Sequence, residues 1–130
     1  MTTIFTDIIE GRRPGFIIYE DSTHVAILDK YPIDTGHSLV IPKTPYEKIT
    51  DMPKNEVAEL FSLVPQIASA ILKATGAVAF SIAQNNGKEA KQIVPHVHVH
   101  IIPRYADKDT MWTKRGMPTE AELENLQQNI

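Results

Sequence analysis

Three histidines alternate with apolar residues just before residue 101, and this pattern restricts how the chain can fold. Residues 95–104 read Pro-His-Val-His-Val-His-Ile-Ile-Pro-Arg. Successive side chains of a β-strand point to opposite faces, so His96, His98 and His100 share one face, with about 7 Å between neighbours. The other face carries only valine and isoleucine. The sequence therefore predicts a strand over 94–102 with one side in the core and a row of imidazoles on the other.

The rest of the chain predicts four more strands and one main helix. Residues 16–20 and 24–29 are rich in β-branched and aromatic residues and form a hairpin around Asp21-Ser22. Further strands are expected at 37–41 and 77–83. Hairpin-linked strands with a segregated helix indicate an α+β fold, with a mainly antiparallel five-stranded sheet covered on one face.

The main helix is predicted over 53–75, where apolar residues recur at spacings of three and four. Pro53 suits the first helical position, and Gly76 suits a left-handed stop. Pro65 lies inside the stripe and is expected to kink or divide the helix, because it lacks a backbone donor.

A single domain is expected over 1–106, followed by a tail over 107–130. The tail is polar and has one helical stretch, 119–128, in which Thr119 caps the helix and Glu122 completes a capping box. We expect this tail to pack on the domain or on a partner subunit.

Composition narrows the classes of function. The chain has 130 residues, one domain's worth, with 13 Lys and Arg against 16 Asp and Glu. This balance disfavours bulk binding to nucleic acid or an anionic membrane, and no apolar run approaches the ~20 residues of a membrane span. The absence of cysteine excludes disulfides and thiolate ligands and fits a cytoplasmic protein.

The histidine row allows two chemistries, and spacing alone does not choose between them. Neutral imidazoles bind metals, and a His-x-His pair with His100 or His37 as third ligand could hold a catalytic zinc. Alternatively, one imidazole attacks an electrophilic centre while its neighbours bind phosphate oxygens or transfer protons.

These residues resemble the histidine triad (HIT) superfamily of nucleotidyl hydrolases and transferases. Residues 96–102 match its His-φ-His-φ-His-φ-φ signature, where φ is apolar, at every position, and residues 36–43 are similar to its Gly-His-x-Leu-Val-Ile-Pro-Lys block. The segments 4–11, 19–29 and 84–87 also match, in the same order. The resemblance covers about residues 3–106 and implies a HIT-like fold.

The resemblance implies roles for individual residues. His98 would be the nucleophile that attacks the α-phosphorus, and His100 would contact the phosphate and assist the leaving group. His37 and His96 would support the nucleophile, and Asp29 would hold the ribose hydroxyls. The remaining implied contacts are the phosphate-side residues Asn85 and Gln92, and the base-pocket residues Phe5, Ile8 and Ile27.

Two departures from the family pattern qualify that picture. Many microbial members bind a structural zinc through a Cys-x-x-Cys pair, an added histidine and a triad histidine; Thr3, Thr6 and Pro45 stand at the first three positions here. We therefore expect no structural zinc and no other cofactor. Lys91 stands at a usual glycine, and Ile93 replaces a usual hydroxyl residue, which lowers the expectation of phosphoramidase activity without affecting nucleotide binding.

The leading hypothesis is a hydrolase or transferase of Hint type that cleaves AMP-like esters or phosphoramidates, such as purine ribonucleotide derivatives of AMP or GMP, through a nucleotidyl-histidine on His98. The resemblance implies a homodimer. The alternatives are a dinucleoside polyphosphate hydrolase of fragile-histidine-triad type, a non-catalytic nucleotide-binding dimer, and a metalloenzyme. Trp112 is a candidate for shaping a partner's specificity or for packing the tail, and His24 is left outside the site.

Overall fold

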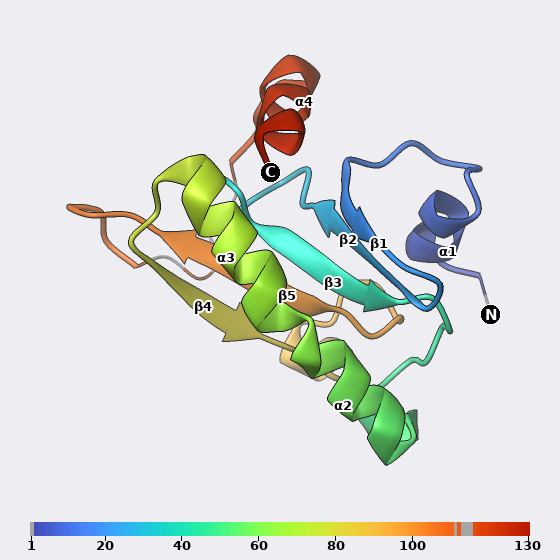
Figure 1. The fold of residues 1–130 in the computed structure, drawn as a ribbon. Helices are drawn as coiled ribbons and strands as arrows, with labels where there is room; N and C mark the ends of the chain where they lie inside the picture. Colours follow the sequence, from blue (N-terminus) through green and yellow to red (C-terminus); the bar gives the residue numbers. More distant parts are fainter. Residues whose placement is uncertain (1, 111, 113–115) are drawn as a thin grey trace.

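The computed structural model describes residues 2–110, 112 and 116–130, so residues 111 and 113–115 of the expected tail lie outside it. Its elements (Figure 1) are α1 (Ile4–Ile9), β1 (Ile17–Glu20), β2 (His24–Leu28), β3 (Ser38–Pro42), η1 (Ile49–Asp51), α2 (Lys54–Ser62), α3 (Val64–Thr75), β4 (Ala79–Ala83), η2 (Lys88–Ala90), β5 (Val99–Arg104) and α4 (Glu120–Asn129). The predicted α+β class with a five-stranded sheet is confirmed.

The sheet has the order β1-β2-β3-β5-β4, and every neighbouring pair is antiparallel. The chain therefore inserts its last strand, β5, between β3 and β4. This insertion places β5 in the interior of the sheet, where Leu39 of β3 faces His100 on one side and Ala83 of β4 faces it on the other. The histidine segment is thereby held by two strands.

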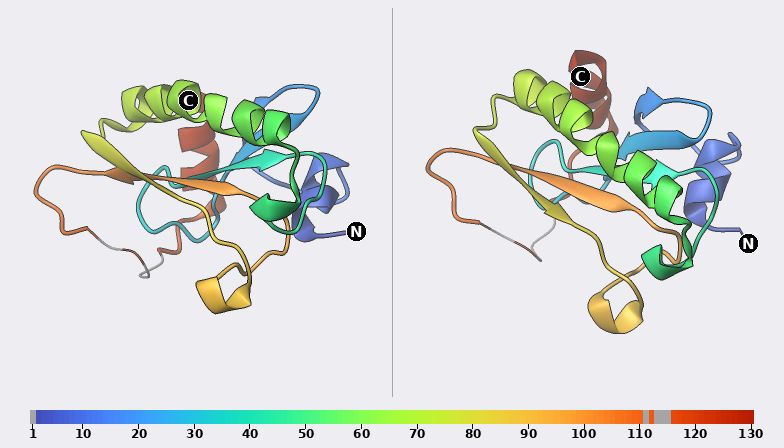
Figure 2. Two further views of the ribbon diagram at one scale, coloured as in Figure 1. Left: turned by 90° about the horizontal axis from the view of Figure 1, so that it is seen from below. Right: turned by 60° about the horizontal axis from the view of Figure 1, so that its bottom comes forward.

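Each face of the sheet has its own apolar cluster. Ala26, Val40, Val99 and Ile101 pack under α2 and α3, whose buried residues include Leu60, Val64, Ile67, Ala68 and Ile71. The alternate residues Val25, Ile27, Leu39 and Ile41 pack with Phe5 of α1 on the opposite face. Figure 2 shows α2 and α3 as one layer over the sheet, with α1 near the other face.

The long helical stretch divides at Leu63, as Pro65 predicts. Proline occupies the first turn of α3, where a missing donor costs no helical hydrogen bond. Gly76 ends α3 with φ +75°, the left-handed conformation expected of it. Pro53 differs from its prediction by one position, because it is the N-cap of α2 and not its first helical residue.

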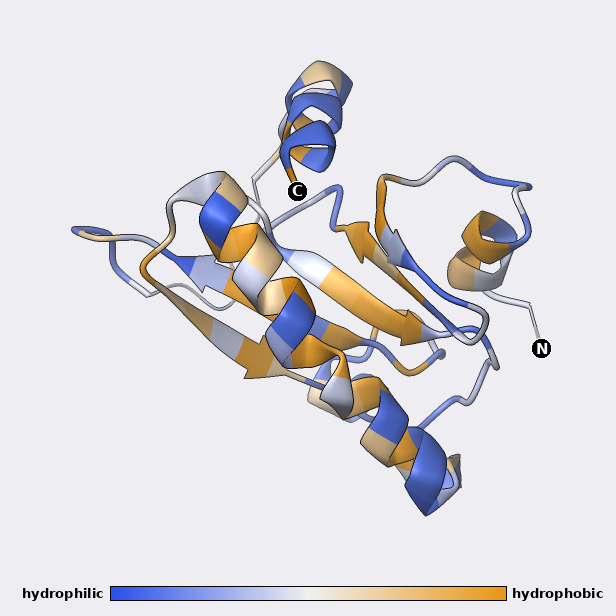
Figure 3. Ribbon diagram, viewed as in Figure 1, coloured by the Kyte–Doolittle hydropathy of each residue, from blue (hydrophilic) through white to orange (hydrophobic). Residues whose placement is uncertain are grey.

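By length and composition alone, the stretch Lys54–Thr75 would be long and apolar enough to cross a membrane, although sequence inspection predicts no such run. A helix that covers the core of a sheet passes the same test. Here the residues that pack on the sheet lie on one side of α2 and α3, and hydrophilic residues alternate with them along the surface (Figure 3).

The tail helix α4 confirms its predicted capping box. Thr119 accepts a hydrogen bond from the backbone of Glu122, whose carboxylate accepts one from the Thr119 backbone in return. Leu123 is buried, and Gln127 donates to the carbonyl of Ile17 in the edge strand β1. The helix thus packs beside the Ile17 end of the edge strand within the same chain.

Strand β5 is shorter at its start than the sequence predicts. It spans Val99–Arg104 and not 94–102, because the backbone before Val99 has other partners. Pro95 has no donor, His96 N–H donates to Val94, and Val97 N–H donates to the carbonyl of Tyr46. His96 consequently lies in a bend, and His98 in an irregular segment, before the strand.

Candidate active site

His98 is held in one tautomer by the backbone beside it. Its Nδ1 lies 2.7 Å from the carbonyl oxygen of His96, which can only accept a hydrogen bond, so Nδ1 carries the proton. In the neutral ring, the lone pair then resides on Nε2. The His98 ring also contacts two others, with its centroid 5.0 Å from Phe5 and 4.9 Å from His100. The outcome is a buried imidazole whose nucleophilic nitrogen is defined by its neighbours.

His37 and His100 form a hydrogen-bonded pair whose direction can be assigned. The backbone N–H of Ile33 donates to His37 Nδ1 at 3.0 Å, so the proton of neutral His37 is on Nε2. That Nε2 lies 2.9 Å from Nδ1 of His100 and donates to it. Neutral His100 therefore carries its own proton on Nε2. His98 thus has a lone pair at Nε2, and the neighbouring His100 has a proton at its Nε2.

Two local features position His37 beside His100 and bring Asp29 to the same place. Gly36 has φ +89°, which strains any other residue, and an added Cβ would lie 3.0 Å from Thr75 and 3.2 Å from Pro103, so both neighbours would have to shift by a few tenths of an ångström. Asp29 N–H donates to the His37 carbonyl, and its carboxylate lies 3.7 Å from His37 Nε2. The strand end therefore presents a carboxylate beside the imidazole pair.

Asp29, His37 and His100 also have the composition of a metal site. One ligand atom from each lies within 4.8 Å of the others. However, the Ile33 hydrogen bond assigns the lone pair of His37 to Nδ1, so its Nε2 would have to lose a proton before binding a cation. The donor set favours a hydrogen-bonded cluster over a metal site in this arrangement.

His96 is fully buried and anchored at both ring nitrogens. Nε2 lies 2.8 Å from the Pro42 carbonyl and donates to it, while Nδ1 lies 3.0 Å from the Thr3 hydroxyl. Burial lowers the pKa of His96 below its usual value, although the Pro42 hydrogen bond opposes this shift and nearby His98 adds to it. His96 is therefore neutral around pH 7.

This lowered pKa makes the stability of the fold depend on pH. Below about pH 6.5, the unfolded chain binds a proton at His96 that the folded protein does not bind, so stability falls with acidification until the folded pKa is reached. The contribution of one such group approaches about 1.4 kcal/mol per pH unit. Urea unfolding between pH 7.5 and 5.5 should show a steeper decline for the wild type than for His96→Gln. Equal slopes would contradict the assignment.

The three expected base-pocket residues form a single apolar cluster. Phe5 and Ile27 are buried, and Ile8 packs against them on the α1 side of the sheet. Phe5 lies edge-on to both His96 and His98. The structure thus brings this cluster directly beside the proposed nucleophile, while also giving each residue a packing role.

The loop after β4 carries the two expected phosphate-side residues, Asn85 and Gln92. Asn85 lies two residues beyond the end of β4, whose last residue, Ala83, pairs with His100. The Gln92 side chain is occupied by the protein itself, since its oxygen accepts from Gly87 N–H and its nitrogen donates to the Glu47 carbonyl. Substrate binding by the Gln92 side chain is therefore disfavoured by its present contacts, which hold the loop closed.

The structure explains the family's usual residue at position 91 but not the isoleucine at position 93. Lys91 has φ +69°, a conformation that glycine adopts at lower cost, so the structure accounts for the family's usual glycine there. Ile93 is 83% exposed and has no hydroxyl to offer. Nothing in the fold explains why isoleucine stands at that position.

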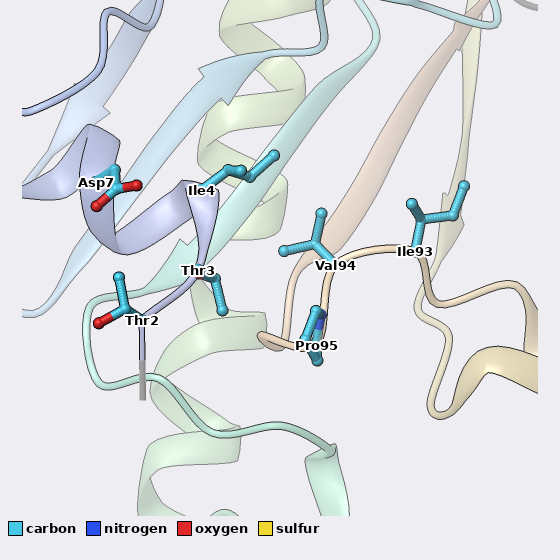
Figure 4. Close-up of a pocket in the computed structure, with 7 residues that line it drawn as sticks. All are labelled: Thr2, Thr3, Ile4, Asp7, Ile93, Val94 and Pro95. Carbon is cyan, nitrogen blue, oxygen red and sulfur yellow. The ribbon is translucent and has the colours of Figure 1, made fainter.

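A cavity of about 390 Å³ adjoins the site between α1 and this loop. Figure 4 shows Ile4 and Val94 extending into the space between the two segments. Its lining consists of Thr2, Thr3, Ile4, Asp7, Ile93, Val94 and Pro95. Thr3 both lines this cavity and contacts His96, so it lies between the cavity and the histidine cluster.

The two remaining candidates lie in structural contacts. His24 is buried, with Nδ1 3.3 Å from Asp21 in the β1–β2 turn, and is separate from the cluster, as expected. The Trp112 ring lies 4.7 Å from the guanidinium of Arg104. This contact fits the tail-packing alternative for Trp112 and leaves the specificity alternative untested.

The fold and the site together define an α+β protein with a cluster of buried imidazoles on, just before and beside the interior strand β5 of its sheet. Residues 10–107 match the family model described as the HIT domain. The chain belongs to the HIT family.

Individual relatives agree with this assignment. The chain is 42% identical over 114 residues to the Arabidopsis thaliana adenylylsulfatase HINT3, a match that covers 88% of the chain but only 57% of that protein. It is 38% identical to the Schizosaccharomyces pombe adenosine 5′-monophosphoramidase hnt1, with 80% and 75% of the two chains covered. The crystal structure of a hypothetical histidine triad nucleotide-binding protein from Sulfolobus tokodaii superposes with a TM-score of 0.89 at 34% identity, covering 97% and 87%. At family level these matches support a nucleotide hydrolase.

Proposed function

We propose that this protein cleaves AMP-like phosphoramidates or esters through a covalent nucleotidyl-histidine on His98. The observation that carries the proposal is the hydrogen bond from His98 Nδ1 to the His96 carbonyl, which assigns a lone pair to Nε2. A neutral imidazole with a fixed tautomer is suited to nucleophilic attack on phosphorus near pH 7. The adenylylsulfatase and monophosphoramidase relatives support the choice of substrate class.

The reaction proceeds in two steps. His98 Nε2 attacks the α-phosphorus and forms a phosphorus–nitrogen bond. The bond between phosphorus and the leaving group breaks, and the leaving group keeps the electron pair. Because a neutral imidazole is too weak an acid to give up its proton, the His37–His100 pair would take up one further proton together with the anionic substrate; His100 Nε2–H then gives a proton to that leaving group and leaves the pair neutral. In the second step, water attacks the same phosphorus and gives a proton back to His100, which releases the nucleotide and restores both histidines. His37 supports His100 by donating to its Nδ1.

The residues around the cluster are suited to a purine ribonucleotide. The Asp29 carboxylate could accept hydrogen bonds from two vicinal ribose hydroxyls, and Asn85 would bind the phosphate. Phe5, Ile8 and Ile27 would contact the base through the apolar surface that they share. Because Ile93 has no hydroxyl, His100 would be the principal donor to the leaving group.

A substrate panel tests the proposal against its alternatives. Adenosine 5′-phosphoramidate, adenylyl sulfate and diadenosine tetraphosphate would be compared by kcat/KM at equal enzyme concentration. The proposal expects AMP release from one or both of the first two substrates at a higher kcat/KM than from the third. Preference for diadenosine tetraphosphate would favour the fragile-histidine-triad type, and AMP binding without turnover of any substrate would favour a non-catalytic protein.

We also propose a homodimer formed through β4. This strand is an edge of the sheet, and Phe80 and Ile82 expose apolar side chains on one face, together with Val78 just before it. At the opposite edge, α4 of the same chain already contacts β1 at Ile17. A second copy pairing with β4 would bury the apolar side chains and extend the sheet.

Replacing Ile82 by lysine should therefore weaken dimerisation by at least about 10-fold, because a charge would be buried at the proposed interface. Sedimentation velocity should show wild type near twice its 14.6 kDa chain mass and the variant near one chain mass. Ile93→Lys is the matched control, since it adds the same charge at an exposed isoleucine away from β4. A wild-type monomer, or dimers in all three proteins, would contradict this interface.

A further inference from the structure

The first turn of the chain is joined directly to the histidine segment through one hydroxyl. Thr3 is the N-cap of α1, and its Oγ1 accepts from Phe5 N–H at 3.2 Å and Thr6 N–H at 3.3 Å. The same oxygen lies 3.0 Å from His96 Nδ1, across 93 positions of sequence. Both Thr3 and His96 are buried. The Thr3 hydroxyl is therefore fixed on two sides, by the backbone N–H groups of α1 and by the His96 ring.

The direction of each hydrogen bond follows from the donors available. His96 Nε2 donates to the Pro42 carbonyl, so the neutral ring has its lone pair on Nδ1. The Thr3 hydroxyl must then be the donor to Nδ1. A hydroxyl has one proton and two lone pairs, and the two backbone N–H groups use the lone pairs. Thr3 therefore uses its full hydrogen-bonding capacity at this point.

This arrangement does not fit the structural zinc that the family resemblance leads one to consider. Thr3 and Thr6 offer neutral hydroxyls where that site has cysteines, and Pro45 offers no side-chain donor atom. In the assigned tautomer, the single ring lone pair of His96 already accepts from Thr3. Here hydrogen bonds connect the start of α1 to His96 without a metal.

The connection matters because His96 lies outside the regular sheet. Strand β5 begins at Val99, so ladder hydrogen bonds do not hold residue 96. Its ring is fixed instead by Thr3 on one side and Pro42 on the other. Its carbonyl, in turn, accepts the Nδ1 proton of His98 at 2.7 Å. The position of that carbonyl decides how the His98 ring is oriented.

We propose that Thr3 is a positioning residue whose hydroxyl, acting through His96, sets the orientation and tautomer of His98. The proposal rests on the proposed function for its kinetic consequence, since Thr3 does not itself contact the His98 ring nitrogens. Its structural consequence, the tautomer of His98, can be measured without any substrate.

Three variants separate positioning from simple stability. Thr3→Val removes the hydroxyl and keeps the shape, whereas Thr3→Ser keeps the hydroxyl. Thr6→Val is the matched control: it removes the other half of the capping box, where Thr6 Oγ1 accepts from Thr3 N–H at 2.6 Å, but leaves the hydroxyl that contacts His96. Thermal unfolding of all three variants gives the loss of stability that each change causes.

Turnover of adenosine 5′-phosphoramidate is the kinetic measurement. Thr3→Val should lower kcat roughly 10- to 100-fold, because a misoriented nucleophile costs rate in the chemical step. KM should stay within about threefold, and Thr3→Ser should recover most of the loss. Thr6→Val should retain near-wild-type kcat even if its unfolding temperature falls as far. Equal losses of kcat in Thr3→Val and Thr6→Val would overturn the proposal.

Long-range ¹H–¹⁵N NMR of histidine-labelled protein is the second measurement. The wild type and Thr6→Val should show His98 protonated at Nδ1, and Thr3→Val should show a mixture of tautomers. An unchanged His98 tautomer in Thr3→Val would overturn the proposal. If the wild type turns over no nucleotide, the proposed function fails, but these spectra still decide the role of Thr3.

Discussion

Replacing His98 by alanine should lower kcat for AMP-like substrates by at least about 10⁴-fold, a loss of the size seen when a covalent nucleophile is removed. The affinity for AMP should stay within about threefold, because the bond that His98 forms belongs to the transition state and intermediate and not to the bound product. Steady-state kinetics with adenosine 5′-phosphoramidate and calorimetric titration with AMP give the two values. A large loss of turnover with little loss of binding is the expected result.

His24→Ala is the matched control for this variant. It also removes a buried imidazole, but one at the start of β2 beside Asp21 of the β1–β2 turn, separate from the histidine cluster. Its turnover per folded molecule should equal that of the wild type. If His98→Ala kept more than a tenth of wild-type turnover, His98 would not be the nucleophile. Loss of AMP binding together with turnover would instead make it a binding residue.

Replacing His100 by alanine should have an effect that depends on the leaving group. Ammonia leaves phosphorus only after it is protonated, so loss of the His100 proton should slow cleavage of adenosine 5′-phosphoramidate by about 10²- to 10⁴-fold. A 4-nitrophenolate ion leaves without protonation. The same variant should therefore cleave the 4-nitrophenyl ester of AMP within about tenfold of the wild-type rate. Single-turnover rates with the two substrates measure the difference.

The leaving-group comparison distinguishes proton donation from other roles. His37 donates to His100, and Asp29 lies beside His37, so a purely structural role for His100 would disturb all of these contacts. Such a disturbance would slow both substrates by the same factor. Equal slowing would therefore contradict general acid catalysis by His100.

Local patterns predict most of the fold, because each uses signals within a few residues. The division of the helix at Pro65, the left-handed Gly76 and the Thr119 capping box all depend on such signals. The order β1-β2-β3-β5-β4 depends on contacts between distant segments, and neither periodicity nor propensity encodes it. Helix α1 also escapes prediction: it has six residues and is stabilised by its cap and by burial of Phe5.

The site shows the same division between local and distant information. Alternation alone places His98 and His100 on one face, and the family resemblance adds His37 and Asp29. The start of β5 is wrong because Val97 bonds to Tyr46, 51 positions earlier, and no pattern in residues 94–98 signals this. The Thr3 contact to His96 is similarly hidden, since a threonine near the start of a chain is ordinary by itself. The missing cysteines are the available signal, because they draw attention to position 3.

Trapping the covalent intermediate would test directly whether His98 is the nucleophile. The protein would be mixed with adenosine 5′-phosphoramidate and quenched within milliseconds in base, in which phosphorus–nitrogen bonds to histidine survive. Intact-mass and peptide mass spectrometry would then locate any added AMP. The expected result is an AMP adduct on His98 that is absent from His98→Ala and decays as free AMP appears. Turnover without an adduct at any time, or an adduct on another residue, would contradict it.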